Sequence, residues 1–111
     1  MSPLNITREA ATGPVVHVAS DLDYGHVAAM RQHIDALDLY PGQCLVIDLA
    51  GMEFCDSSGI TALIAAHQRA LAADADIALA AVPDNTLRIL AIVGLDQIFT
   101  FHPDADTATT S

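Results

Sequence analysis

The stretch VIDLAGMEFCDSSGITALIAAHQRA, residues 46–70, decides the fold. It continues a compact apolar run, residues 44–49, that is rich in β-branched side chains and is typical of a strand buried on both faces of a sheet. Apolar residues at helical spacing then recur over residues 60–71 and predict an amphipathic helix. A polar junction of sequence DSSG, residues 56–59, joins the two. A strand that passes directly into such a helix favours an α/β domain.

The rest of the chain repeats this alternation of strands and helices. The expected elements are two short strands joined by a turn at residues 13–14, a helix over 26–37, the strand and helix of the quoted stretch, a strand over 76–82, a helix over 83–93 and a strand over 97–101. Because consecutive strands joined by helices favour right-handed crossovers, we expect an α/β fold with a mixed, mostly parallel sheet of about four to five strands. The amphipathic helices should pack mainly on one face of this sheet. Residues 1–103 should form one domain, and residues 104–111 a polar tail that frays.

Composition excludes several classes of function. With 14 acidic residues, 4 basic residues and a net charge of −10, the chain lacks a surface that could neutralise the phosphates of a nucleic acid. All basic residues are arginines, which excludes a phosphate-binding loop that needs lysine. The two cysteines and five histidines show no metal-ligand spacing, so neither a metal nor a cofactor is expected. The absence of a signal-peptide pattern and of a long apolar run predicts a soluble, cytoplasmic protein with no membrane span.

The DSSG junction is more polar than a helix start requires. Asp56 or Ser57 could cap the helix, because a short side-chain oxygen accepts a hydrogen bond from one of the first helical N–H groups. One cap suffices, and a glycine in the first turn, here Gly59, costs about 1 kcal/mol relative to alanine. Partners of open α/β sheets meet the segments beyond the carboxyl ends of the strands. We therefore expect Gly59 to let a partner approach the backbone closely.

Two enzyme classes can be compared with this junction. A nucleophile elbow needs G-x-S-x-G, and Cys55 or Asp56 occupies the place of its first glycine. A receiver-like domain phosphorylated on Asp48 is an alternative, because this aspartate ends the buried strand. Receivers as a family also use a lysine, which this chain does not have.

The quoted stretch resembles the signature of the STAS domain, the fold of bacterial anti-sigma factor antagonists: a strand, an aspartate, a short loop, D-S-S-G and an apolar-faced helix. SDLDYG, residues 20–25, is similar to the G-x-L-D turn of the family, with Ser20 in place of the usual glycine. VPDNTLRILAIVGLDQIF, residues 82–99, is similar to the family segment that contains G-L and a later phenylalanine. The resemblance implies a STAS-like fold. Family members usually end in an apolar helix, and residues 102–111 offer little apolar surface for one.

The resemblance also implies a binding switch without catalysis. In antagonists of this type the second serine, here Ser58, is phosphorylated by the partner anti-sigma factor, which acts as a kinase. The unphosphorylated form captures that factor and frees sigma, and a protein phosphatase restores the serine. A phosphate adds about −1.5 to −2 charges. The helix N-terminus tolerates this charge, whereas a docked partner would have to bury it beside Asp56.

Asp23, Asp56, Ser57, Ser58 and Gly59 are the partner-binding residues that the resemblance implies. Ser57 should serve as a cap and Asp48 as a structural hydrogen-bonding group. Cys55 should be a small buried hydrophobe in place of a redox sensor. A STAS scaffold, or a STAS subunit of a membrane lipid transporter, is an alternative without a phosphoswitch, because such modules keep the same fold.

Overall fold

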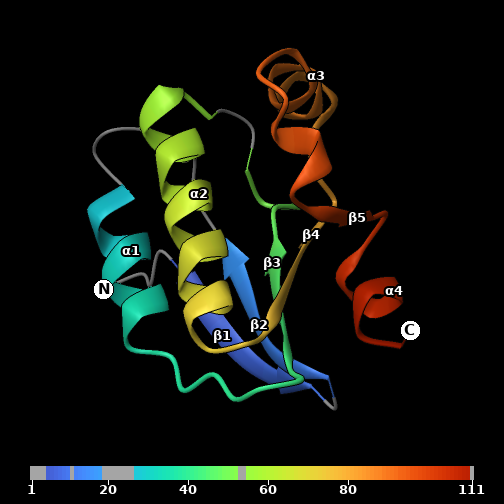
Figure 1. Cartoon of the computed structure of the whole chain (residues 1–111). Coiled ribbons are helices and arrows are strands. Elements are labelled where there is room, and N and C mark those ends of the chain that lie inside the picture. The colour runs from blue at the N-terminus through green and yellow to red at the C-terminus, as the bar shows by residue number, and fades with distance from the viewer. Residues whose placement is uncertain (1–4, 11, 19–26, 53–54, 111) are drawn as a thin grey trace.

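The computed structural model describes residues 5–10, 12–18, 27–52 and 55–110, over which strands and helices alternate (Figure 1). The elements in chain order are β1 (Asn5–Ala10), β2 (Gly13–Val18), α1 (Val27–Asp35), β3 (Cys44–Asp48), α2 (Ser57–Ala72), β4 (Asp76–Ala80), α3 (Asp84–Ile92), the 3-10 helix η1 (Leu95–Gln97), β5 (Thr100–His102) and α4 (Ala105–Thr110).

The five strands form one sheet in the order β1-β2-β3-β4-β5, which is also their order along the chain. β1 and β2 are antiparallel, and each later strand is parallel to its neighbour. The predicted mixed, mostly parallel sheet is therefore confirmed. At the hairpin between β1 and β2, Gly13 has a φ of +141°, and a Cβ there would lie 2.5 Å from the carbonyl oxygen of Cys44. Only glycine fits where the hairpin meets the start of β3.

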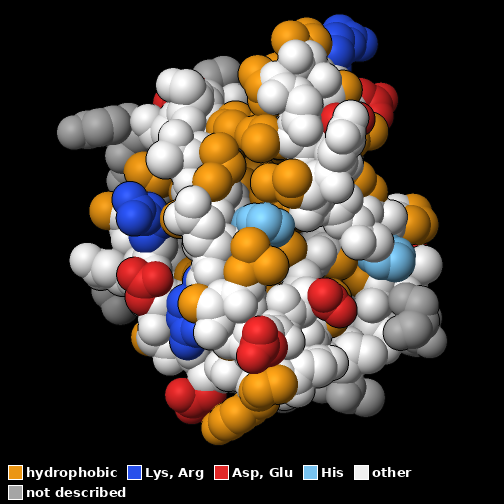
Figure 2. Space-filling model, in the orientation of Figure 1, with side chains coloured by type: hydrophobic (Ala, Val, Ile, Leu, Met, Phe, Trp, Pro, Cys, Tyr) orange, Lys and Arg blue, Asp and Glu red, His pale blue; other side chains and the backbone are white. Residues whose placement is uncertain are grey.

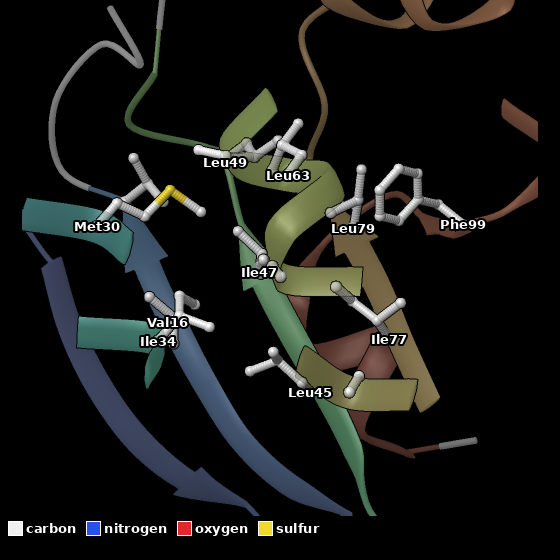
Figure 3. Packing of buried hydrophobic residues seen from close by; sticks show 14 of the residues in the cluster. Val16, Met30, Ile34, Leu45, Ile47, Leu49, Leu63, Ile77, Leu79 and Phe99 are labelled. Carbon is white, nitrogen blue, oxygen red and sulfur yellow. The ribbon is translucent and has the colours of Figure 1, made fainter. Parts of the chain in front are cut away.

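The main hydrophobic core lies between one face of the sheet and helices α1 and α2 (Figures 1 and 3). Val16, Ile47 and Leu79 are register partners on adjacent strands, and all three are fully buried. Met30 of α1 and Leu63 of α2 belong to the same cluster. Each of these side chains contributes about 1.5 to 3 kcal/mol by its removal from water, so the contact between sheet and helices dominates the stability of the domain.

The opposite face of the sheet carries a smaller cluster formed by Val15, Val46, Ala78, Ala80 and Ala108. Val46 and Ile47 are successive residues buried on opposite faces of β3. The prediction of a strand buried on both faces is therefore confirmed.

Residues 104–111, which were expected to be a frayed tail, instead contain helix α4. The backbone N–H of Thr107 donates a hydrogen bond of 2.7 Å to Oδ1 of Asp104, which satisfies one of the free donors at the helix start. This hydrogen bond lowers the pKa of Asp104 below its ordinary value. The buried side chain of Ala108 supplies the apolar contact, and α4 lies against β3, β4 and β5. The described part of this helix thus has a side-chain cap and a buried alanine that faces the sheet.

Two element boundaries differ from the sequence expectation because of the backbone. β4 ends at Ala80, before Ala81, which has a left-handed φ of 55° that a strand cannot continue. Gly94 has a φ of +80° and passes the chain into η1, so the strand expected over 97–101 instead begins at Thr100 and ends at His102.

Candidate functional site

The DSSG junction lies at the edge of the sheet toward which the parallel strands point. In Figure 1 the arrowheads of β2 and β3 and the first turn of α2 lie toward the same end of the molecule. This is where helix N–H groups and strand ends of an α/β sheet meet their partners. The fold therefore places the junction at the edge that the sequence predicted.

Asp56 is the residue that caps α2. Its backbone is extended, with φ −95° and ψ −171°, which is the usual conformation of an N-cap. Oδ1 of Asp56 accepts hydrogen bonds from the backbone N–H groups of Ser58 at 2.8 Å and Gly59 at 3.1 Å. Ser57 is the first helical residue and is exposed, so the expectation that Ser57 serves as the cap is wrong. One carboxylate satisfies both donors, which leaves the Ser57 side chain free of this task.

Ser58 and Gly59 are more enclosed than Ser57. Ser58 is partly buried and Gly59 is buried. Gly59 shares the inner face of α2 with Ala62 and Ala66, and small residues on such a face bring a helix close to the sheet. Gly59 therefore faces the interior of the domain, and the close approach of a partner to its backbone stays a prediction.

An apolar groove of about 490 Å³ begins at the junction and runs between α2 and α3. Figure 2 shows hydrophobic side chains gathered on the surface between these two helices. The groove is lined by Cys55, Asp56, Ser57, Ile60, Thr61, Ile64, Ile89, Val93 and Leu95. Its apolar wall from α3 is exposed to solvent, with Ile89 at 39% and Val93 at 56%. Exposed aliphatic side chains gathered beside a polar rim are typical of a protein-binding surface.

Sequence reasoning missed this groove because α3 does not have one buried stripe. Only Thr86 and Leu90 of α3 are buried, whereas Leu87 and Ala91 are exposed. Aliphatic residues surround α3, so periodicity could not show which side faced the core. A signal that could have found the groove is that this helix carries more aliphatic residues than the core can bury, which predicts an exposed apolar surface.

On the other face of the sheet, Asp48 accepts two hydrogen bonds at the end of β3. Its Oδ2 lies 2.7 Å from Nδ1 of His17, and its Oδ1 accepts from the backbone N–H of Ala50 at 3.0 Å. This geometry confirms the predicted structural role of Asp48. His17 was not singled out from the sequence, because the pairing depends on the register of β2 against β3.

Cys55 behaves as a buried apolar residue. Its side chain is almost completely buried, and burial together with the negative charge of Asp56 raises the pKa of the thiol to about 11. The thiol is therefore protonated at neutral pH, and only the thiolate is a good nucleophile. The expectation of a small buried hydrophobe agrees with this environment.

Several predicted features concern other parts of the chain. Asp23 lies outside the described residues, so its position relative to the junction stays a prediction. Within the ranges that the structure describes, no group of three or more His, Cys, Asp or Glu side chains could hold a metal ion. In the same ranges, no helix combines the length and the apolar character needed to cross a bilayer.

A protein family described as "Mlab, STAS domain" matches residues 6–100. The chain belongs to the STAS domain family. The match covers every strand from β1 to the start of β5 and includes both walls of the groove. No curated protein gave a significant match to this STAS domain.

Solved structures with the same fold include antagonists and a transporter. An anti-sigma factor antagonist from Mycobacterium paratuberculosis is 28% identical, with a TM-score of 0.81 over 96% of this chain and 93% of that chain. SpoIIAA of Bacillus in its phosphorylated form is 15% identical, with a TM-score of 0.70 over 94% of this chain and 95% of that chain. The murine anion transporter Slc26a9 is 21% identical, with a TM-score of 0.76 over 91% of this chain and 18% of that chain.

Proposed function

We propose that this STAS domain is an anti-sigma factor antagonist that binds an anti-sigma factor in the groove between α2 and α3 and is switched off by phosphorylation of Ser58. The observation that carries the proposal is the continuity of the groove with the junction. Ser57 and Asp56 line one end of the groove, and Ser58 is the next residue of the same turn. Ser58 does not itself line the groove, so a charge added there would lie beside the lining residues Asp56 and Ser57, at one end of the apolar surface.

The arrangement of the junction supports a switch by charge. Asp56 already holds the first N–H groups of α2, so the helix does not need a phosphate for its stability. A phosphoserine at position 58 would instead stand beside the Asp56 carboxylate, and a docked partner would have to bury both charges. An unpaired buried charge costs several kcal/mol. A loss of about 3 kcal/mol already weakens binding more than about a hundredfold.

The comparisons support the antagonist function in part. The antagonist from Mycobacterium paratuberculosis is similar over nearly the whole chain, and SpoIIAA is a protein of this fold that exists in a phosphorylated form. We infer that the partner is an anti-sigma factor with serine kinase activity, that a protein phosphatase reverses the modification, and that the domain itself catalyses no reaction. The net charge of −10 favours a partner with a basic surface, because opposite charges steer association.

The test is phosphorylation with a candidate anti-sigma factor and ATP, followed by site mapping. We expect one phosphate on Ser58 that is stable in acid, retained in Ser57→Ala and lost in Ser58→Ala. A phosphate on Ser57 would refute the assignment of the serine. An acid-labile phosphate would point to Asp48 and to the receiver-like alternative, whose geometry is unfavourable because Asp48 already accepts two hydrogen bonds.

A second candidate is a STAS subunit or scaffold of a membrane transporter without a phosphoswitch. The similarity to the murine anion transporter favours it, because there the shared fold makes up a small part of a larger chain. Under this alternative the groove binds another transporter component, and Ser58→Asp binds it as well as the wild type does. Genes for a permease beside the gene for this chain would favour the transporter subunit, and a gene for a kinase-like ATPase would favour the antagonist.

A further inference from the structure

A pair of polar side chains bridges β2 and β3 on the face of the sheet opposite to α1 and α2. His17 and Asp48 are register partners, and each alternates with core residues that point to the helical face. Their side chains are 33% and 14% exposed. Nδ1 of His17 lies 2.7 Å from Oδ2 of Asp48. Because a carboxylate only accepts, Nδ1 carries the hydrogen and donates it. A hydrogen bond to a charged acceptor is among the stronger kinds.

Asp48 links its hydrogen bond with His17 to the turn over residues 49–52, which follows β3. Its second oxygen accepts from the N–H of Ala50, and the N–H of Leu49 donates to the carbonyl of Ala80 on β4 at 2.9 Å. The N–H of Met52 then donates to the carbonyl of Leu49 at 3.0 Å. The turn over residues 49–52 is therefore fixed by backbone hydrogen bonds on one side and by a carboxylate on the other.

The same segment is anchored in the core on the helical face. Leu49, Met52 and Cys55 are all buried in the main hydrophobic cluster. These apolar contacts fix how deep the segment lies, but apolar packing is non-directional. Beside the backbone hydrogen bonds, the Asp48 carboxylate is a directional restraint from a side chain. Its own orientation depends on His17, because an aspartate side chain that is 14% exposed and held by one hydrogen bond can turn toward water.

We propose that His17 is a positioning residue of the switch. It orients the Asp48 carboxylate and thereby holds the turn over residues 49–52. Leu49 and Met52 of this turn lie in the same buried cluster as Cys55, the residue before the Asp56 cap, and through this cluster His17 acts on the junction. His17 does not line the groove, so it acts on partner binding only through Asp48. This last step rests on the proposed function, whereas the effect on the junction is a property of the free domain.

Two substitutions separate positioning from a general contribution to stability. His17→Asn places an amide N–H close to the position of Nδ1 and can still donate to Asp48. His17→Leu removes the donor but suits a strand better, because asparagine is depleted in strands and leucine fits the partly buried surface. If His17 contributes only to the stability of the strand, His17→Leu should perturb the domain less than His17→Asn. If His17 positions the junction, His17→Leu should accelerate amide exchange at the junction more than His17→Asn does.

Amide hydrogen exchange of the free domain is the first measurement. In His17→Leu we expect exchange of the Ala50, Ser58 and Gly59 amides to accelerate about fivefold to tenfold, the factor for losing one such hydrogen bond, while core amides such as Leu79 keep their rate. His17→Asn should restore rates near those of the wild type. Unchanged rates at Ser58 and Gly59 would overturn the proposal. Equal acceleration at Leu79 would also overturn it, because it would indicate global destabilisation.

Binding of a candidate anti-sigma factor is the second measurement. We expect His17→Leu to weaken the affinity about fivefold to tenfold and His17→Asn to recover it. If His17→Leu changes exchange at the junction but leaves a measurable affinity unchanged, the role of His17 in the switch is overturned. If neither the wild type nor the variants bind the factor while the exchange pattern holds, the proposed function fails and the positioning of the junction by His17 stands.

Discussion

α2 and α3 follow neighbouring strands, but their starts are built differently. α2 begins with Asp56, whose carboxylate accepts two backbone hydrogen bonds. α3 has Pro83 at its N-cap and no side-chain hydrogen bond from that cap, although Asn85 accepts from the N–H of Thr86 at 2.8 Å. The start of α2 carries charge and hydroxyl groups, whereas the body of α3 offers exposed aliphatic side chains, led by Ile92 at 77%.

The difference shows how a charge on one helix can control binding at an apolar groove that is shared with another helix. The wall formed by α3 supplies area that a partner can remove from water, and this contribution depends little on charge. The wall formed by α2 decides whether a partner can approach without burying a charge. Because both walls line one groove, a single modification at the start of α2 can cancel the gain provided by α3.

The largest effect is expected from a charge added at the start of α2. Ser58→Asp should weaken binding of the anti-sigma factor by about a hundredfold relative to Ser58→Ala, because an uncompensated charge at the rim costs about 3 kcal/mol. Isothermal titration calorimetry at fixed ionic strength measures the difference. Gln68→Asp, which adds the same charge at an exposed site farther along α2, is the control and should change the affinity less than about threefold. Equal affinities of the two Ser58 variants would refute the switch.

The apolar wall should give the next largest effect. Ile89→Ala removes a side chain that lines the groove and should weaken binding about tenfold, as expected for about 1.5 kcal/mol of lost apolar burial. Ile92→Ala is the matched control on the same helix. Its side chain is 77% exposed and does not line the groove, so its affinity should stay near that of the wild type. If Ile92→Ala weakens binding as much as Ile89→Ala, the partner contacts a different side of α3.

Two substitutions of Asp56 distinguish its hydrogen bonds from its charge, and their expected effects on the free energy of unfolding are smaller. Asp56→Ala should lower the free energy of unfolding by about 1 kcal/mol, because two helical N–H groups lose their acceptor. Asp56→Asn keeps an acceptor oxygen and should lose less. Urea unfolding measures both values. If the two variants are equally destabilised, the carboxylate acts through its charge and the comparison with the uncapped α3 loses its basis.

The smallest effect concerns α4, a helix that is capped like α2 but does not line the groove. The hydrogen bond from Thr107 lowers the pKa of Asp104. Its contribution is therefore present above the unfolded pKa and is lost as the pH falls through the lower folded pKa. We expect Asp104→Ala to raise hydrogen exchange in α4 at neutral pH and to remove this acid dependence. Asp96→Ala is the control. Exchange in α4 that is insensitive to Asp104→Ala would show that the contacts of α4 with the sheet hold the helix without the cap.

The sequence predicts the sheet and the two helices on its main face because burial imposes clear patterns there. The apolar run from Cys44 to Leu49 and the helical spacing from Ile60 onward each follow one physical constraint. α4 was missed because its sequence has no apolar stripe, and its cap and the buried Ala108 are weak signals. A short aspartate-led segment carries a capping signal, Asp104 followed by Thr107, that composition alone does not show.

The candidate site could be predicted only where its features are local in the chain. The position of DSSG at the sheet edge follows from neighbouring residues. They also predict a capping side chain in this junction, but the sequence assigned the cap to Ser57, whereas the structure has it at Asp56. The groove could not be predicted, because it depends on how far α3 stands from α2. The bridge from His17 to Asp48 joins two residues that are 31 positions apart along the chain, and it depends on the register of β2 against β3.

The strand order of this domain also bears on how the chain is made. Each strand pairs with the one that precedes it in the sequence, so during synthesis every strand that leaves the ribosome finds its partner already exposed at the growing edge. No earlier strand has to separate to admit a later one. Since domains begin to fold from the N-terminal side at about 5–20 residues per second, the sheet can be assembled in the order of translation, with the short β5 and the capped α4 closing it last.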